Sequence, residues 1–197
     1  MVTELHLIRH GKTLANEKKL YCGQTDLPLS ESGAEELISL KNQGIYPSWP
    51  RMCDGLFFTS GLIRTEQTAD IICGNVHRTA APDIAEFKFG LFEMQSYDEL
   101  KDREDYQAWI TDETGDFQCP GGESKNQFVK RIVDAFNSIL DQAGDCSAVA
   151  VCHGGTIACI MEYLYPNEKN FYGWQPKPGR GYTLVYESRR LKLYRTI

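Results

Sequence analysis

The stretch that decides the fold is SAVAVCHGGTIACIMEYLY, residues 147–165. Its first six residues, 147–152, form a continuous apolar run bounded by charge and glycine, which is typical of a central parallel strand. Gly154 and Gly155 then open a second run, 156–165, that we expect to be helical. A buried strand that passes directly into a helix indicates an α/β protein.

The same order of elements recurs elsewhere in the chain. Residues 4–9, ELHLIR, alternate and lead into His10 and Gly11, so they predict a strand that ends at a turn. Residues 55–59, GLFFT, fit a short buried strand. Helices are predicted over 30–43 with a stop at Gly44, over 62–73 with Ser60 as N-cap and Gly74 beyond the end, and over 123–143 with Gly144 closing it.

The remaining segments are less regular. In residues 79–95 the apolar positions follow no regular helix or strand period. Residues 96–119 look like an insertion, with short helices near SYDELK and DYQAWI followed by a polar loop. Residues 181–195 predict two alternating strands joined through Ser188, as an edge hairpin. Because strands alternate with helices, we expect an α/β fold with a mainly parallel sheet.

Composition narrows the class of protein. The 197 residues suit one compact domain, and 42% hydrophobic with 24% charged residues is ordinary globular usage. No apolar run approaches the roughly 18 residues that span a bilayer. Glu4 and His6 interrupt the region where a signal peptide needs continuous apolar residues, so we expect a soluble, cytoplasmic protein that binds no membrane.

Charge and cysteine usage exclude two further classes. The net charge is −6, which argues against a nucleic-acid partner but not against a small anion bound in a locally positive pocket. The seven cysteines are odd in number and contain no CxxC pair, so we expect reduced thiols and no zinc site.

Chemistry-bearing residues follow the predicted strands. In open α/β sheets, ligands bind beyond the carboxyl ends of the strands. Three segments lie there, 9–11, 59–64 and 153–155, and they carry two arginines and two histidines. Arginine matches phosphate oxygens, helix N-termini attract anions, and neutral histidine is a nucleophile. These segments predict a phosphate pocket with a histidine nucleophile, which needs a carboxylic acid to protonate the leaving oxygen.

The chain also resembles a known family in several segments. LIRHGKTLAN resembles the RHG signature of the histidine phosphatase superfamily, the phosphoglycerate mutase-like proteins. Five further segments are similar to motifs of that family and stand in the same order, which argues against a chance match. They are 23–33, SGLIRTEQTA at 60–69, IAEFKFGLFE at 84–93, PGGES at 120–124 with Phe128 and Arg131, and VCHGG at 151–155.

The resemblance implies roles for individual residues. His10 would take the phosphoryl group as a phosphohistidine, and Glu86 would protonate the leaving group and then activate water. Arg9, Arg64 and His153 would clamp the phosphate oxygens. The rest of the implied substrate-binding set is Asn16, as a further donor, with Gly23, Thr25 and Gly154. No metal and no organic cofactor is implied.

The family also implies an architecture. We expect a three-layer α/β sandwich with a mainly parallel central sheet, helices on both faces and a phosphoglycerate mutase-like topology. Residues 1–197 would form one domain, with a small cap built from the insertion near 96–120 and part of 16–30. Two departures bear on substrate identity: Phe92-Glu93-Met94 replaces the frequent Trp-Glu-Gly, which narrows a pocket wall, and Gly61 stands where Pro or Asp is common.

We therefore expect an enzyme that hydrolyses a small phosphorylated metabolite through a phosphohistidine. The short chain and the PGGES segment look more like the α-ribazole phosphatase branch than the mutases, since Lys88, Lys101 and Arg103 are the only cations between Glu86 and PGGES. Two alternatives stay open: a cofactor-dependent phosphoglycerate mutase, and a catalytically inactive module that binds a phosphometabolite. A homodimer is also left open.

Overall fold

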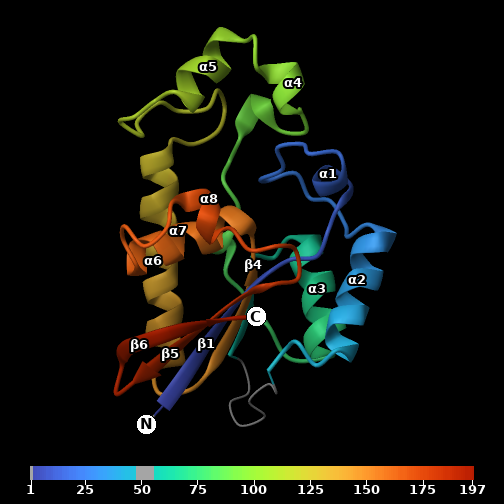
Figure 1. The fold of residues 1–197 in the computed structure, drawn as a ribbon, viewed down its shortest axis with the longest axis vertical. Helices are drawn as coiled ribbons and strands as arrows, with labels where there is room; N and C mark the ends of the chain where they lie inside the picture. The colour runs from blue at the N-terminus through green and yellow to red at the C-terminus, as the bar shows by residue number, and fades with distance from the viewer. Residues whose placement is uncertain (1, 48–55) are drawn as a thin grey trace.

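The computed structural model describes residues 2–47 and 56–197 (Figure 1). Its strands are β1 (Val2–Arg9), β2 (Phe57–Thr59), β3 (Thr79–Ala80), β4 (Ala148–Cys152), β5 (Gly181–Glu187) and β6 (Arg190–Thr196). Its α-helices are α1 (Leu14–Glu17), α2 (Glu31–Asn42), α3 (Ile63–Cys73), α4 (Tyr97–Leu100), α5 (Glu104–Ile110), α6 (Lys125–Ala143), α7 (Gly154–Leu164) and α8 (Phe171–Trp174). Gly55, in the strand predicted over 55–59, and Cys53 lie outside the described residues.

One mixed sheet organises the molecule. Its strand order is β3-β2-β4-β1-β5-β6, with β1, β2, β3 and β4 paired in parallel and β5 and β6 added antiparallel. All five residues of β4 are buried, which confirms the predicted central strand. In the register of β1 and β4, Arg9 lies opposite Cys152. His10 and His153 therefore leave the sheet side by side.

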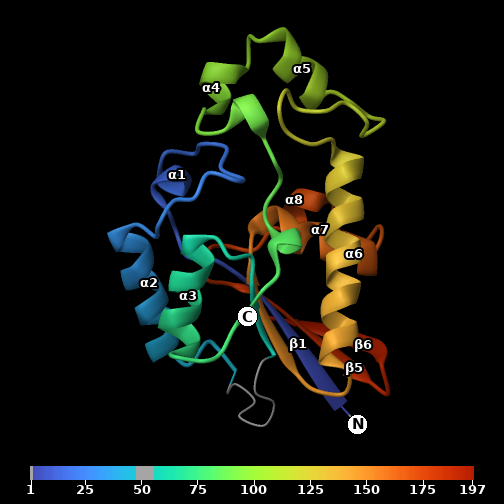
Figure 2. The ribbon, with the colours of Figure 1, turned by 180° about the vertical axis from the view of Figure 1, so that it is seen from behind.

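Helices cover both faces of this sheet. Helices α2 and α3 lie on one face and α6 and α7 on the other (Figures 1 and 2). Alternate side chains of the strands supply two separate cores: Leu7 and Ala150 join the core under α6 and α7, while Ile8 and Val151 join the core under α2 and α3. The predicted three-layer α/β sandwich is confirmed.

The longest helix follows its sequence pattern closely. A capping box at Ser124 and Gln127 starts α6. Its buried face is Phe128, Ile132, Phe136, Ile139 and Ala143. Gly144 ends the helix with a φ of 59°, a left-handed conformation that glycine adopts without strain.

The start of α3 differs from the prediction. Ser60 is not the N-cap, because the helix begins at Ile63 and its N-cap, Leu62, makes no side-chain capping bond. The amide of Ile63 instead donates to Oδ1 of Asp26, at 2.8 Å. The Ser60 hydroxyl is engaged elsewhere, at 2.8 Å from Nε2 of His153. A distant aspartate thus caps α3 and ties the 23–26 loop to it.

The segment 96–119 holds the two predicted short helices, α4 and α5. They lie beyond the carboxyl end of the sheet, at the top of Figures 1 and 2. Trp109 packs on Phe87 and Phe89 with ring centroids 5.7 and 6.0 Å apart, and the hydroxyls of Tyr21 and Tyr106 lie 2.6 Å apart. This aromatic packing attaches the segment to the sandwich.

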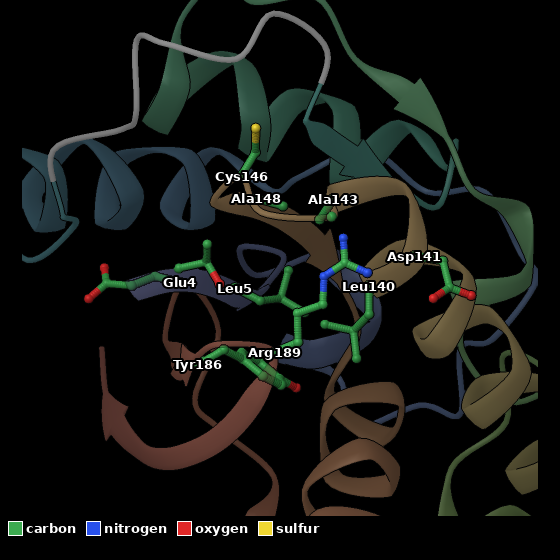
Figure 3. A pocket seen from close by; sticks show the side chains of 11 residues that line it. Glu4, Leu5, Leu140, Asp141, Ala143, Cys146, Ala148, Tyr186 and Arg189 are labelled. Atoms are coloured by element: carbon green, nitrogen blue, oxygen red, sulfur yellow. The ribbon is translucent and has the colours of Figure 1, made fainter. Parts of the chain in front are cut away.

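The opposite end of the sheet holds a cavity of about 180 Å³ (Figure 3). It is lined by the starts of β1 and β4 and by the end of α6, and Arg189 extends across it while pairing with Asp145. Since the candidate catalytic residues follow the ends of these strands, this cavity is separate from them. No helix within 2–47 and 56–197 combines the length and apolar character that crossing a bilayer requires.

Candidate active site

His10 follows β1 directly and is buried, with 6% of its surface exposed. Its Nδ1 lies 2.6 Å from the carbonyl oxygen of Gly11. Because a carbonyl can only accept, Nδ1 carries the proton and Nε2 keeps its lone pair. Burial, with the positive charges of Arg64 and Arg9, holds the pKa of His10 well below 6.5. His10 is therefore a neutral imidazole with a nucleophilic nitrogen at neutral pH.

Arg64 lies in the first turn of α3 and is 1% exposed. Its Nη2 donates to the carbonyl of Gly23 at 2.6 Å, and its Nη1 donates to the carbonyl of Thr25 at 2.9 Å. Two backbone carbonyls thus hold this buried guanidinium, and none of the described carboxylates bonds to it. The group is therefore available to an anion.

Arg9 is the last residue of β1, and the loop after α8 supports it. Its Nη1 donates to the carbonyl of Pro176 at 2.7 Å. Burial lowers the pKa of Arg9, and the negative charge of Glu86 raises it. Gly154 leaves room for the Arg9 side chain, because a Cβ at position 154 would lie 2.9 Å from the guanidinium carbon of Arg9.

His153 follows β4 and is completely buried. Its Nε2 lies 2.8 Å from the hydroxyl of Ser60, and its ring lies 5.1 Å from that of His10, at 65°. Burial and the charge of Arg64 hold the pKa of His153 well below 6.5. A phosphate dianion beside it would favour its protonated form, in which both ring nitrogens donate.

Glu86 reaches the N-terminus of α7, next to His153, from a loop. Its Oε2 accepts from the amide of Gly155 at 2.8 Å, and its Oε1 accepts from the amide of Phe87 at 2.9 Å. The amide of Gly155 belongs to the N-terminus of α7, which favours negative charge. A Cβ at position 155 would lie 2.3 Å from Oε1 of Glu86, so a larger residue there would displace the carboxyl group. The carboxyl group is thereby oriented at both oxygens.

Three buried nitrogens of this group have no hydrogen-bond partner in the part of the chain that the structure describes. They are Nε of Arg9, Nε of Arg64 and Nδ1 of His153. Buried polar atoms are almost always paired, so a cluster of unpaired ones requires an explanation. Two guanidinium groups and an imidazole with free capacity, beside a neutral histidine, have the chemistry to bind a tetrahedral oxyanion.

The other predicted contact residues lie around this group. Asn16 uses its Oδ1 to cap α1 at Thr13, which leaves Nδ2 as its donor. Gly23 and Thr25 contact Arg64 through carbonyl oxygens, so the phosphate contact predicted for them stays a prediction. Within 2–47 and 56–197, no group of three or more His, Cys, Asp or Glu side chains is arranged to hold a metal ion.

Sequence reasoning missed the part that Glu93 plays. Its carboxylate accepts from the amides of Gly23, Gln24 and Thr25 at 2.9–3.3 Å and from the hydroxyl of Thr25 at 2.8 Å. These are the residues whose carbonyls hold Arg64. Glu93 lies within a segment that resembles a family motif, but nothing in the sequence indicates that its partner is a loop 70 residues away.

Comparison with known proteins identifies the family. Residues 5–195 match the model of the histidine phosphatase superfamily, branch 1, and the chain belongs to that superfamily. Members of the superfamily are enzymes, either phosphatases or mutases.

Among individual relatives and structural neighbours, some are named as mutases and one is named as a phosphatase. A relative from Yersinia pestis, called probable phosphoglycerate mutase GpmB, is 30% identical over 169 residues, or 82% of this chain and 74% of the relative. The crystal structure of phosphoglycerate mutase from Thermus thermophilus is 28% identical, with a TM-score of 0.69 and 98% of each chain covered. A putative alpha-ribazole-5'-P phosphatase from Escherichia coli has a TM-score of 0.79 at 23% identity, covering 97% of this chain and 95% of that one, which shows a shared fold.

The contacts of Glu93 generate a first prediction. In Glu93→Gln, an amide NH2 would face backbone amides that now donate hydrogen bonds to the carboxylate. The 23–25 loop and the Arg64 side chain that it holds should therefore become less firmly positioned. We expect competitive inhibition by orthophosphate to weaken by about tenfold, the size of one charge-assisted hydrogen bond. Asp112→Asn is the matched control, because Asp112 organises the 112–117 loop through the same kind of bonds. Equal inhibition constants for Glu93→Gln and the unmodified chain would contradict the prediction.

The two buried histidines generate a second prediction. Since their folded-state pKa values lie below the ordinary 6.5, the unfolded chain binds protons more readily as the pH falls below that value. Their contribution to stability is complete above pH 6.5 and is lost as the pH falls toward the folded-state pKa values. We expect the urea midpoint to fall between pH 7 and pH 5, and to fall less steeply in a His10→Asn, His153→Gln double variant. Identical slopes for the two proteins would refute this assignment.

Proposed function

We propose that this chain hydrolyses a small phosphomonoester through a phosphohistidine at His10. One observation carries the proposal: three buried nitrogens with no partner among the described residues lie near a histidine whose hydrogen bond to Gly11 leaves Nε2 as its nucleophilic nitrogen. Phosphoryl transfer needs positioning and the stabilisation of charge on three equatorial oxygens. Arg9, Arg64 and His153 have the chemistry for that task.

In the first step, Nε2 of His10 attacks phosphorus, and the bond from phosphorus to the ester oxygen breaks. The electron pair leaves with that oxygen, which takes a proton from the carboxyl group of Glu86. The guanidinium groups of Arg9 and Arg64 bind the oxygens of the transferring group. The products of this step are the free alcohol and the phosphohistidine.

In the second step, the Glu86 carboxylate takes a proton from water as the water oxygen attacks phosphorus. The bond from phosphorus to His10 breaks, its electron pair returns to Nε2, and orthophosphate leaves. Glu86 thus alternates between acid and base. Its two backbone hydrogen bonds support this reading, because they orient the carboxyl group for both steps.

Charge pairing favours a monoester over a bisphosphate. Of the three cations between Glu86 and the PGGES segment, Lys101 pairs with Asp98 and Arg103 pairs with Asp105. Lys88 has no carboxylate partner within the described residues. A bisphosphate-dependent mutase needs further cations for its second phosphate, so we favour hydrolysis of a singly phosphorylated metabolite, with α-ribazole phosphate as a candidate.

The phosphoglycerate mutase reaction is the second candidate. The names of the Yersinia and Thermus relatives favour it. It uses the same phosphohistidine but returns the phosphoryl group to an alcohol instead of water. For either reaction, we propose that residues 96–120 and part of 16–30 form a cap over the site and exclude solvent.

Phosphate release from a panel of esters tests the proposal. The panel is α-ribazole phosphate, 3-phosphoglycerate, sugar phosphates and p-nitrophenyl phosphate, each with EDTA present. We expect release that falls by at least about 10³-fold in His10→Ala, because the nucleophile is lost. Circular dichroism should show the variant folded. Phosphate transfer between hydroxyls without net release would favour the mutase, and undiminished release by His10→Ala would refute the nucleophile assignment.

The acid role of Glu86 gives a further prediction. In Glu86→Gln, kcat/KM should fall by about 10²-fold for phenyl phosphate, because phenolate needs protonation to leave. The fall should be much smaller for p-nitrophenyl phosphate, whose leaving group is stable as an anion. Since kcat/KM covers only the steps up to loss of the alcohol, slow hydrolysis of the phosphohistidine does not affect it. Equal losses for the two esters would contradict an acid role.

A further inference from the structure

A buried ion pair lies behind the loop that carries Glu86. Nη2 of Arg131, on α6, lies 2.6 Å from Oε1 of Glu123, and its Nε lies 3.2 Å from Oε2. The Arg131 side chain is 15% exposed and that of Glu123 is 8% exposed. Glu123 precedes the N-cap of α6, so the pair links the start of the helix to a point two turns along it.

Arg131 and Glu123 form hydrogen bonds with backbone groups on both sides of Glu86. Nη1 of Arg131 donates to the carbonyls of Asp83 and Ala85 at 2.8 and 3.0 Å, and its Nη2 donates to the carbonyl of Glu86 at 3.3 Å. Oε1 of Glu123 accepts from the amide of Lys88 at 2.9 Å. The amide of Glu123 also donates to the carbonyl of Lys88, at 2.9 Å. Backbone groups from residue 83 to residue 88 therefore converge on two side chains.

This loop has little regular structure of its own. Between β3 and Gly90 it contains a single 3-10 turn, Pro82–Ile84, so strand or helix bonds do not fix Glu86. Its carboxyl group is held by the α7 N-terminus and its own loop, while its carbonyl oxygen accepts from Gln24 at 2.9 Å and from Arg131 on α6 at 3.3 Å. A shift of about 1 Å in a catalytic group can cost roughly 10²-fold in rate. The backbone contacts therefore bear on catalysis.

We propose that Glu123 and Arg131 are positioning residues that hold Glu86 in register with the leaving oxygen. This inference rests on the proposed function, in which Glu86 is the acid. Neither residue touches the substrate. Both act on the proton transfer through the backbone of residues 83–88, so their loss impairs esters whose leaving group needs a proton.

A purely structural ion pair would behave differently. Removing one partner of a buried pair destabilises the protein whether or not the pair serves catalysis. Lower stability alone therefore does not distinguish the two roles, whereas the dependence of kcat/KM on the leaving group does. Phenyl phosphate and p-nitrophenyl phosphate are nearly equal in shape, so their ratio of kcat/KM values isolates the need for a proton.

The experiment compares Glu123→Gln and Arg131→Lys with the unmodified chain. Lysine keeps the charge of Arg131 but cannot reach Glu123 and three carbonyls with one ammonium group. We expect kcat/KM for phenyl phosphate to fall about tenfold or more and that for p-nitrophenyl phosphate to fall less than about threefold, a weaker form of the Glu86→Gln pattern. Equal losses for the two esters, or no loss in either, would overturn the inference.

Arg78→Lys is the matched control. The Arg78 side chain is also 15% exposed, pairs with Glu66 and donates to a backbone carbonyl, but it contacts α3 and not the Glu86 loop. It should lower the urea midpoint without changing the ratio between the two esters. A ratio changed as much by Arg78→Lys as by Arg131→Lys would overturn the inference, because general loosening would then suffice.

A double variant tests whether the pair acts through Glu86. If it does, Arg131→Lys should lower kcat/KM for phenyl phosphate by less than about twofold when Glu86 is already glutamine, since the positioned group is gone. Full additivity of the two losses would overturn the inference.

A cavity beside Arg131 offers a rescue experiment. It has a volume of about 470 Å³ and is lined by Arg131, Asp83 and Asp134, among others. Millimolar guanidinium should partly restore the phenyl phosphate rate of Arg131→Ala without affecting Arg131→Lys or the control. Rescue of both esters in equal proportion would indicate a structural role.

Failure of the inference and failure of the proposed function give different results. If Glu86→Gln shows the leaving-group dependence and the Glu123 and Arg131 variants do not, the positioning role is wrong and the acid stands. If Glu86→Gln shows no such dependence, the acid assignment itself is wrong, and the positioning role falls with it.

Discussion

Positive charge is buried at the carboxyl end of β1 and β4, and no carboxylate among the described residues bonds to it. Arg64 is held by two carbonyls and Arg9 by one, and in the same part of the chain each keeps an unpaired nitrogen. Buried guanidinium groups are costly unless their donors are satisfied, so the surrounding backbone has to be rigid. The parallel register of β1 with β4, the 23–25 loop and the N-terminus of α7 all serve this requirement. The same unpaired capacity underlies the proposal that the site binds a multiply charged oxyanion.

Rigidity at this site comes from carboxylates one layer away from the anion. Glu93 organises the loop that holds Arg64, Asp26 caps α3, and Glu123 with Arg131 braces the loop of Glu86. Each of these carboxylates accepts hydrogen bonds from backbone amides near the site and does not bond to Arg9 or Arg64. Glu86 is the carboxylate whose charge acts on Arg9. This arrangement explains how an acidic chain presents a locally positive pocket.

Periodicity and glycine positions predicted the α/β class, the buried central strand and the segments that supply the site, because they encode local structure directly. The three-layer sandwich and the choice of Glu86 came from the family resemblance, and the structure places Glu86 at the N-terminus of α7, near His153. The sequence could not predict the tautomer of His10 or the partners of Glu93, which depend on contacts between distant segments. The prediction of Ser60 as N-cap of α3 was wrong for the same reason. Asp26, from another loop, accepts from the first amide of α3, while the Ser60 hydroxyl bonds to His153.

The pairing of β1 also governs how the chain comes to be folded. Glu4 and Ser147 bond across 143 positions, and the other neighbour of β1 is β5, which comes later still. During synthesis, β1 therefore has no strand partner until β4, residues 148–152, has been made. Contacts of such sequence separation form slowly because the closure of a long loop precedes any gain. His10 and His153, which follow these two strands, can consequently come together only after both strands have been made.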